Sequence, residues 1–478
     1  MKNLSSSRRY VRIIFYIITM MLMSITICAF MQPLNVSANE PLPTQRLGDY
    51  LYYYPDYNNV YGYVGTEEDI VIPIINNDPI EIYTLGKNKY IRNVTLNDKV
   101  WSVDNYAFKG CKNLQNIYVD PDNEYYSSID GVLFDKEGTT LLIYPPGRTQ
   151  AEYHIPGGTL DVSSIAFGKE RCFLNLRLYL KRIYLPASVE ECIVDFETLK
   201  AVYVDSKNEK YMSIDGMLIE RKTGELVLYP EAKSKRFISP DELKSIGENV
   251  FYQKGIRYAG FNDDLSKIGT YAFYGCRLRK VDIPDNVSLI EAYAFDKNRI
   301  RILKLGDSVR IIDTGAFNRN KIRKLRIGSS VEVIGSKAFL ENRIASLKLN
   351  DSLEYINGSA FEDNKITRLE LNNSLIWIGG RAFENNRIVK LKLNNSLEYI
   401  GGYAFSGNNI KGELILPASL EYIGEYAFTS ERISKVVISD GVLIEGSLFG
   451  SDKFKIAYDE HGAGEYVRTD EGEWIKVD

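Results

Sequence analysis

The sequence has 478 residues, 45% of them hydrophobic and 26% charged, so the chain can build one large hydrophobic core or several ordinary ones. Its 36 Gly and 15 Pro are an ordinary share, which excludes collagen-like and low-complexity proteins. Only two residues are His, which disfavours most zinc sites and most histidine-based acid–base chemistry.

Residues 1–38 have the pattern of a secretory signal peptide. Basic residues within 1–12 precede an apolar run over 13–31, and Pro33 and a small-residue site at 36–38 follow. We expect cleavage after Ala38; an uncleaved anchor is the alternative, because the apolar run approaches the length that spans a bilayer. Cleavage removes four of the 59 bases and no acid, so 55 bases remain against 63 acids, which disfavours a nucleic-acid partner. No second apolar span follows, so we expect no membrane span in the mature chain.

Residues 39–100 are expected to form an N-terminal cap. This range begins with a Tyr-rich segment at 50–63 and continues with an apolar segment at 69–73. A stack of repeated coils needs atypical ends, because its terminal coils would otherwise expose the core. We therefore expect the strands of this range to cover the first coil.

Residues 101–260 are expected to hold irregular repeats with two inserts. Segment 123–131 resembles segment 208–216, and an apolar run, a glycine turn and a second apolar run follow each of them. This pattern predicts β-hairpin inserts at 120–148 and 205–233 that project from longer coils.

Residues 261–450 carry a strict sequence repeat with a period of 22. Its clearest mark is an Ala-Phe pair, with Phe at positions 273, 295, 317, 339, 361, 383 and 405, and at 428 after one step of 23. One unit reads I-x-x-L-x-L-x-x-S-L-x-x-I-G-x-x-A-F-x-x-N-x. Two leucines two residues apart lie on one face of a short strand, Gly379 and Gly380 would permit a tight bend, and the Phe would fill the far end of the coil. Stacked coils then share one core, and 451–478 forms the C-terminal cap.

A recurring Asn is predicted to form a structural ladder. A buried amide must have its donors and acceptor satisfied, and a column of amides can bind the backbone of adjoining coils. Cys276 and Cys111 occupy the same position, so we expect small buried thiols there. The ladder residues are Asn298, Asn320, Asn342, Asn364, Asn386 and Asn408.

The repeat resembles the BspA-like leucine-rich repeats of bacterial surface proteins. Residues 183–189 (Ile-Tyr-Leu-Pro-Ala-Ser-Val) and 414–424 fit that motif almost letter by letter, and the resemblance covers about residues 60–467. It implies a leucine-rich-repeat solenoid of right-handed coils, each of about 22–23 residues, with short parallel β-strands, little helix and hairpin inserts in the N-terminal half. It also implies a secreted or surface-displayed binding protein, adhesin-like in some members. The central coils depart from the family in using Asn in place of Cys, and no wall-sorting motif is present.

No catalytic, cofactor or metal site is expected. His154 lies in a strand-like segment and His461 in a glycine-rich turn, and neither has metal-ligand spacing. The acidic residues of 120–124 lack the spacing of a calcium loop and are interpreted as turn residues. Motifs of acyl transfer, nucleotide hydrolysis and dinucleotide binding are missing, so we expect a protein that is not an enzyme.

Two surfaces are candidates for partner binding. Residues 271–410 hold 22 bases and 15 acids, and the side chains between the two leucines of each strand should face outward, where they would attract an anionic partner. The alternative is a charged face that only keeps a long sheet soluble. A stripe of aromatic residues, one per coil, is the second candidate, with stacking between coils as its alternative. The basic candidates are Lys304, Arg326, Lys348, Lys392, Arg301, Arg323 and Arg368, and the aromatic candidates are Tyr355, Trp377 and Tyr399.

The sequence therefore predicts a non-enzymatic recognition scaffold, secreted or on the cell surface, that binds a protein or an anionic polymer or glycan without any cofactor. A secreted enzyme or accessory protein acting on polysaccharide through the inserts is one alternative, and a structural surface-layer component is another. The ligand, the means of surface retention and the oligomeric state stay open.

Overall fold

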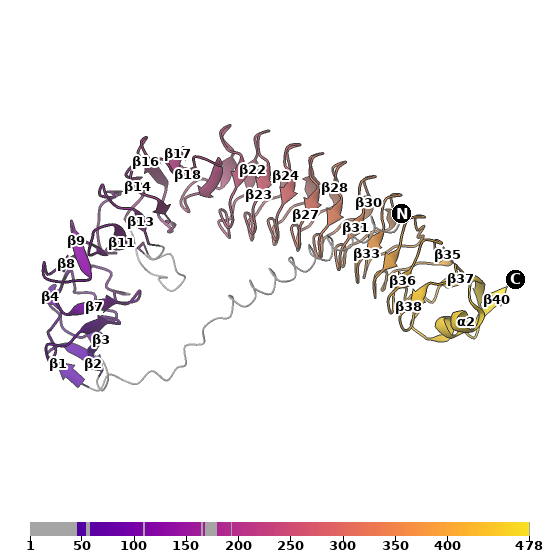
Figure 1. Cartoon of the computed structure of the whole chain (residues 1–478), viewed down its shortest axis with the longest axis horizontal. Coiled ribbons are helices and arrows are strands. Elements are labelled where there is room, and N and C mark those ends of the chain that lie inside the picture. Colours follow the sequence, from indigo (N-terminus) through magenta and orange to yellow (C-terminus); the bar gives the residue numbers. More distant parts are fainter. Residues whose placement is uncertain are drawn as a thin grey trace, which may run out of the picture.

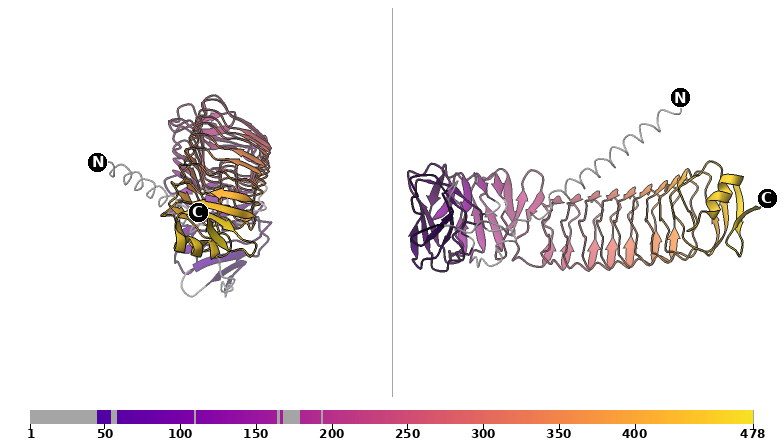
Figure 2. Two further views of the ribbon diagram at one scale, coloured as in Figure 1. Left: turned by 90° about the vertical axis from the view of Figure 1, so that its right-hand side faces the viewer. Right: turned by 90° about the horizontal axis from the view of Figure 1, so that it is seen from below.

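The computed structural model describes residues 45–53, 58–108, 110–163, 166–167, 179–192 and 194–477, and the expected signal peptide lies outside these ranges. The chain is a stack of coils that follows a single arc, shown in Figure 1. Short strands of successive coils pair in parallel and form rows along separate sides of the stack, which Figure 2 shows from two further directions.

The N-terminal coils contain four sheets within the described ranges. An antiparallel ribbon of β1 and β2 continues through β3 into parallel pairing with β5 and β7, so coil stacking begins inside the range expected for the cap. The strands of the first two sheets are β1 (Gln45–Leu47), β2 (Tyr50–Tyr53), β3 (Asn58–Tyr63), β5 (Ile80–Ile82) and β7 (Val100–Val103), and β4 (Asp69–Val71), β6 (Asn93–Leu96) and β8 (Asn116–Val119). The strands of the next two are β9 (Tyr126–Ile129), β10 (Val132–Asp135), β11 (Thr140–Ile143), β13 (Asp161–Val162) and β15 (Glu191–Cys192), and β12 (Glu152–His154), β14 (Arg182–Leu185) and β16 (Ala201–Val204).

Both predicted hairpin inserts are present, but they do not project from the coils. Each is a three-stranded antiparallel unit whose last strand pairs in parallel with the following coil, as β11 does with β13 and β19 with β21. Val132, Leu133 and Phe134 on the middle strand are all fully buried. A hairpin with both faces covered cannot stand free in solvent, so each insert is part of a sheet.

The longest sheet has 13 strands, and most of them are only two residues long. It begins with the second insert and runs through every regular coil, and each two-residue strand ends in the buried Ile of the repeat. Its strands are β17 (Tyr211–Ile214), β18 (Met217–Glu220), β19 (Glu225–Leu228), β21 (Ser245–Ile246), β23 (Lys267–Ile268), β25 (Leu289–Ile290), β27 (Ile311–Ile312), β29 (Val333–Ile334), β31 (Tyr355–Ile356), β33 (Trp377–Ile378), β34 (Tyr399–Ile400), β36 (Tyr422–Ile423) and β38 (Leu443–Ile444).

The strands expected from the paired leucines form a second row on the same coils. Most of the three-residue strands have their central residue inside and its neighbours toward solvent, as in Arg368–Glu370, where Leu369 is buried and both neighbours are exposed. The row comprises β20 (Arg236–Ile238), β22 (Tyr258–Gly260), β24 (Lys280–Asp282), β26 (Ile302–Lys304), β28 (Lys324–Arg326), β30 (Ser346–Lys348), β32 (Arg368–Glu370), β35 (Gly412–Ile415) and β37 (Ile433–Ile438).

A column of Phe rings and the Asn ladder hold the regular coils together. Successive rings from Phe273 to Phe428 are stacked, with centroids 5.1 to 5.5 Å apart and planes within 8°. Asn342 shows how the ladder works: its Nδ2 donates to the carbonyl of Phe317 in the preceding coil at 2.9 Å, and its Oδ1 accepts the N–H of Ile322 at 3.0 Å. The predicted ladder is confirmed.

The paired glycines have a different role from the one expected. Left-handed backbone falls on residues beside the Ala-Phe pair, such as Ser359 (φ 58°) and Asp363 (φ 56°), and not on Gly379 or Gly380. A Cβ added to Gly379 would lie 2.6 Å from the backbone nitrogen of Gly358. These glycines therefore permit close approach between the backbones of successive coils, where a bend was predicted.

The C-terminal end contains the helix α2 (Lys453–His461), which buries Phe454, Ala457 and Tyr458, and a sheet of β35, β37, β39 (Gly464–Arg468) and β40 (Trp474–Val477). His461 is the last residue of α2, so its assignment to a glycine-rich turn was wrong. His154 lies at the end of β12, as expected. No helix of the described ranges is long and apolar enough to cross a membrane.

Candidate binding surfaces

The second row of strands forms an exposed, largely basic surface, which we call the strand face. It consists of the outward side chains of β24, β26, β28, β30 and β32 and of the residues that precede these strands. Lys348 and Arg368 are exposed on neighbouring strands, and Leu347 and Leu369 beside them are buried. This alternation fixes the direction of each charged side chain, because successive residues of a strand point to opposite faces.

Two of the predicted basic residues are engaged in contacts between coils. The Nζ of Lys304 lies 3.6 Å from Oδ1 of Asp282, and Arg326 bonds to Asp307 at 3.0 Å. The backbone N–H of Ser329 also donates to Asp307, and these donors hold the pKa of the Asp307 carboxyl below its usual value. Because Asp282 and Asp307 balance their charges, Lys304 and Arg326 offer less positive charge to a partner than the sequence predicted.

The other predicted basic residues form no ion pair within the described part of the chain. All five are exposed. They occupy five successive coils, four of the strand face and the coil that follows it, so a long partner could contact all of them at once. These residues are Arg301, Arg323, Lys348, Arg368 and Lys392.

The aromatic candidates lie on the 13-stranded sheet and are separated from the basic residues. Tyr355, Trp377 and Tyr399 are the first residues of β31, β33 and β34 and are half-buried. The rings of Trp377 and Tyr399 are stacked with centroids 3.6 Å apart, and Tyr422 continues the stack at 4.7 Å. Because both faces of the Tyr399 ring are covered by Trp377 and Tyr422, Tyr399 presents mainly its edge to solvent. Burial also raises the pKa of Tyr399.

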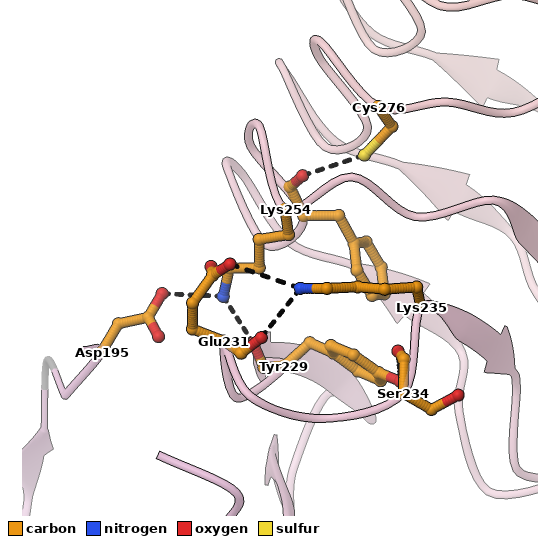
Figure 3. Close-up of polar contacts among 8 residues, drawn as sticks. Asp195, Tyr229, Glu231, Ser234, Lys235, Lys254 and Cys276 are labelled. Carbon is orange, nitrogen blue, oxygen red and sulfur yellow. Dashed lines mark hydrogen bonds and ion pairs between the residues drawn. The ribbon is translucent and has the colours of Figure 1, made fainter. Parts of the chain in front are cut away.

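A buried ion pair joins two coils of the irregular range, the second of which adjoins the regular stack. Lys254, whose side chain is 5% exposed, occupies the Asn position of the repeat and contacts Oδ2 of Asp195 at 2.7 Å. Its Nζ also donates to the carbonyl of Tyr229, as shown in Figure 3. Burial raises the pKa of the neighbouring Glu231 carboxyl. Lys235 opposes this shift, because its Nζ lies 3.4 Å from Oε1 of Glu231. Through Lys254, which contacts both Asp195 and the backbone carbonyl of Tyr229, these charged residues connect two coils that are far apart in the sequence.

The described residues provide no reactive thiol and no metal site. Cys111 and Cys276 are buried and form no disulfide, and Cys192 is buried as well. Burial raises the pKa of the thiols to about 12 for Cys111 and about 11 for Cys276, which keeps both protonated and poorly nucleophilic. No group of three His, Cys, Asp or Glu lies close enough to hold a metal ion within the ranges that the structure covers.

A column of bases beside the strand face was not predicted. The residue that follows the ladder position is basic in six successive coils, and each of these side chains is exposed. The basic residues repeat every 22 positions, as the Phe residues do. Comparing the charge at each position of the repeat would therefore predict this column from the sequence. The column consists of Arg277, Arg299, Lys321, Arg343, Lys365 and Arg387.

These coils, with their buried leucine and isoleucine columns and their paired short strands, define a leucine-rich-repeat solenoid. The family model of the BspA type leucine rich repeat region (6 copies) matches residues 58–148, 227–344 and 332–455, more than half of the chain. The protein therefore belongs to the BspA-type leucine-rich-repeat family, as its sequence motifs indicated.

Solved structures with similar folds come from several bacteria. The pneumococcal vaccine antigen PcpA is 17% identical and has a TM-score of 0.39, and the match covers 69% of this chain and 91% of that one. A leucine-rich repeat protein from Eubacterium ventriosum is 18% identical, with a TM-score of 0.38 and coverage of 74% and 89%. A leucine rich cell surface protein from Faecalibacterium prausnitzii is 18% identical, with a TM-score of 0.36 and coverage of 70% and 97%. No curated protein matches the chain.

Proposed function

We propose that this protein is a non-enzymatic binding scaffold, secreted or displayed on the cell surface, whose strand face receives a protein or an anionic polymer. The observation that carries the proposal is the set of exposed bases on the strand face that form no ion pair in the described ranges. Repulsion between like charges on neighbouring strands disfavours the folded chain, so a surface of this kind is better explained by a partner than by stability.

The other features of the site favour binding over catalysis. The thiols with a raised pKa are protonated, the ring of Tyr399 is covered on both faces, and the inserts are built into sheets. A rigid array of strands also presents many side chains at fixed positions with little loss of entropy on binding. The alternative, an enzyme acting on polysaccharide, would be supported by turnover of a polysaccharide by the purified protein.

A charge-reversal experiment tests the proposal. The chain with Lys348→Glu and Arg368→Glu should lose most of its retention on immobilised dextran sulfate at physiological salt, by about tenfold or more in affinity. The matched control, Lys112→Glu and Lys200→Glu, makes the same change of net charge at exposed positions away from the strand face and should bind as the wild type does. Equal loss in both variants would show that only net charge matters. Fractionation of the producing culture should find the protein outside the cytoplasm.

A further inference from the structure

The six bases found beside the strand face, which we call the basic column, occupy one position of six consecutive coils. All six side chains are exposed, and none forms an ion pair within the described ranges. The column is bounded by Gly255 in the coil before it and by Asn409 in the coil after it. Its members are Arg277, Arg299, Lys321, Arg343, Lys365 and Arg387.

Backbone hydrogen bonds fix the spacing of the column. The N–H of Lys321 donates to the carbonyl of Ile300 in the preceding coil at 3.0 Å, and the N–H of Arg343 donates to Ile322 at 3.0 Å. The same bond recurs at each of the six positions. Because paired strands lie about 4.8 Å apart, the cations should repeat at about that interval along the stack.

Elsewhere the molecule balances charges between successive coils. Arg310 bonds to Glu332 at 2.9 Å and Arg319 bonds to Glu341 at 3.2 Å, and both pairs join equivalent positions of neighbouring coils. The basic column has the same geometry but a single sign of charge. Adjacent like charges cost stability, so the column calls for an explanation other than coil stacking.

We propose that the basic column binds a linear acidic polysaccharide that carries one carboxylate on each sugar. This inference rests on the proposed function and names the ligand class and the residues that bind it. One sugar of such a chain is about as long as one coil is thick, so carboxylates follow the stack at about the interval of the cations. The long Arg and Lys side chains can reach carboxylates that project in different directions from the chain. Four of the six residues are Arg, whose guanidinium binds a carboxylate in a bidentate manner.

The neighbouring side chains favour a polysaccharide over a nucleic acid. Arg279, Arg301 and Arg323 form a second basic row two residues further along the chain, which ends at Ala345 in the next coil. No aromatic residue interrupts the column, whereas single-stranded nucleic acids are bound by stacking of their bases on aromatic rings. In a B-DNA duplex the phosphates of each strand repeat at about 3.4 Å along the helix axis, which loses register with the coils.

Binding of oligogalacturonates of graded length tests this inference. The affinity of the full-length protein should rise steeply from the trimer to the hexamer, because each added sugar meets a further cation, and should rise little beyond it. The variant Arg299→Gln, Lys321→Gln, Arg343→Gln should bind the hexamer about 10- to 100-fold more weakly. It should also show a shallower dependence on salt, because fewer counterions are released.

The control variant Lys112→Gln, Lys200→Gln, Lys222→Gln removes the same charge from exposed positions outside the column and should bind as the wild type does. Fully methyl-esterified galacturonate chains should not bind. Equal binding of the hexamer by the wild type and the column variant, or tighter binding of polyphosphate or single-stranded DNA than of galacturonate, would overturn the inference. In that case, binding of dextran sulfate that depends on Lys348 and Arg368 would still support the proposed function. If dextran sulfate also failed to bind, both the inference and the proposed function would be wrong.

Discussion

At the scale of the residue, the ladder position requires a side-chain donor to the preceding coil more than it requires Asn. Asn298 donates from Nδ2 to the carbonyl of Phe273, Cys276 donates from Sγ to Phe251 at 3.1 Å, and Lys254 donates from Nζ to Tyr229. All three bonds span the same separation along the chain. Asn makes more hydrogen bonds at this position than Cys or Lys, because its Oδ1 also accepts a backbone N–H of the preceding coil.

Asp296 provides a pH-dependent test at this scale. Burial raises the pKa of its carboxyl to about 6, well above the value of 3.8 for an exposed Asp. Between about pH 4 and pH 6 the folded chain therefore holds more protons than the unfolded chain, so this residue makes the protein less stable as the pH rises. Asp296→Asn should raise the free energy of unfolding at pH 7 by about 1–3 kcal/mol, with no gain below pH 4.

Urea unfolding at pH 7 and pH 4 measures this effect. The next coil carries Asn318 at the equivalent buried position, so the fold accepts the substituted side chain. A gain of the same size at both pH values would mean that ionisation of Asp296 is not its cause.

At the scale of the element, each coil is one apolar layer closed by a single Phe. Phe361 is fully buried, and its ring stacks on Phe339 and Phe383 at 5.2 and 5.4 Å. Phe361→Ala should cost about 3–5 kcal/mol, because it removes the largest apolar side chain of its coil and leaves a cavity. Phe361→Leu should cost less than about 2 kcal/mol. Urea unfolding followed by circular dichroism compares the two, and equal costs would contradict the cavity argument.

The repeat in the sequence predicted the coils but only one of their two strands. The leucines of 368–371 show the alternation that marks a strand facing a core. The strand Tyr355–Ile356 is too short to show any period, and only pairing with the equivalent strands of the neighbouring coils makes it part of a sheet. The role of Gly379 was missed for the same reason, since the backbone it must admit belongs to another coil.

The candidate surfaces were predicted in part. The strand alternation correctly pointed Lys348 and Arg368 outward. It did not show that Lys304 and Arg326 are paired with acids, because those contacts depend on the order in which coils stack. Whether either candidate surface binds a partner remains a prediction.

At the scale of the whole molecule, the core of the described residues is divided into three clusters, and the regular coils form the largest. The contact between Lys254 and Asp195 connects the second and third clusters in chain order. Lys254→Met should weaken this junction by about 3 kcal/mol, because it leaves the carboxylate of Asp195 largely buried without its cation. Adding Asp195→Leu to Lys254→Met should recover part of that loss.

Hydrogen exchange measured on peptides of the full chain locates the effect. Exchange in Lys254→Met should become faster in segments on both sides of the junction, such as 201–260, and should stay unchanged in the coils beyond residue 320. Uniformly faster exchange along the whole stack would contradict a local role for the ion pair.

The invariance of the contacts between coils has a consequence for the gene. Within residues 277–409, hydrogen bonds and ring stacks recur in the same pattern from each coil to the next. Loss or duplication of one whole coding repeat by recombination would therefore preserve the recurring hydrogen bonds and Phe stacks, change only the ion pairs at the new junction, and alter the length of the stack. Copy number can drift without disturbing the fold, and natural variants should differ in the number of coils more readily than in their interior.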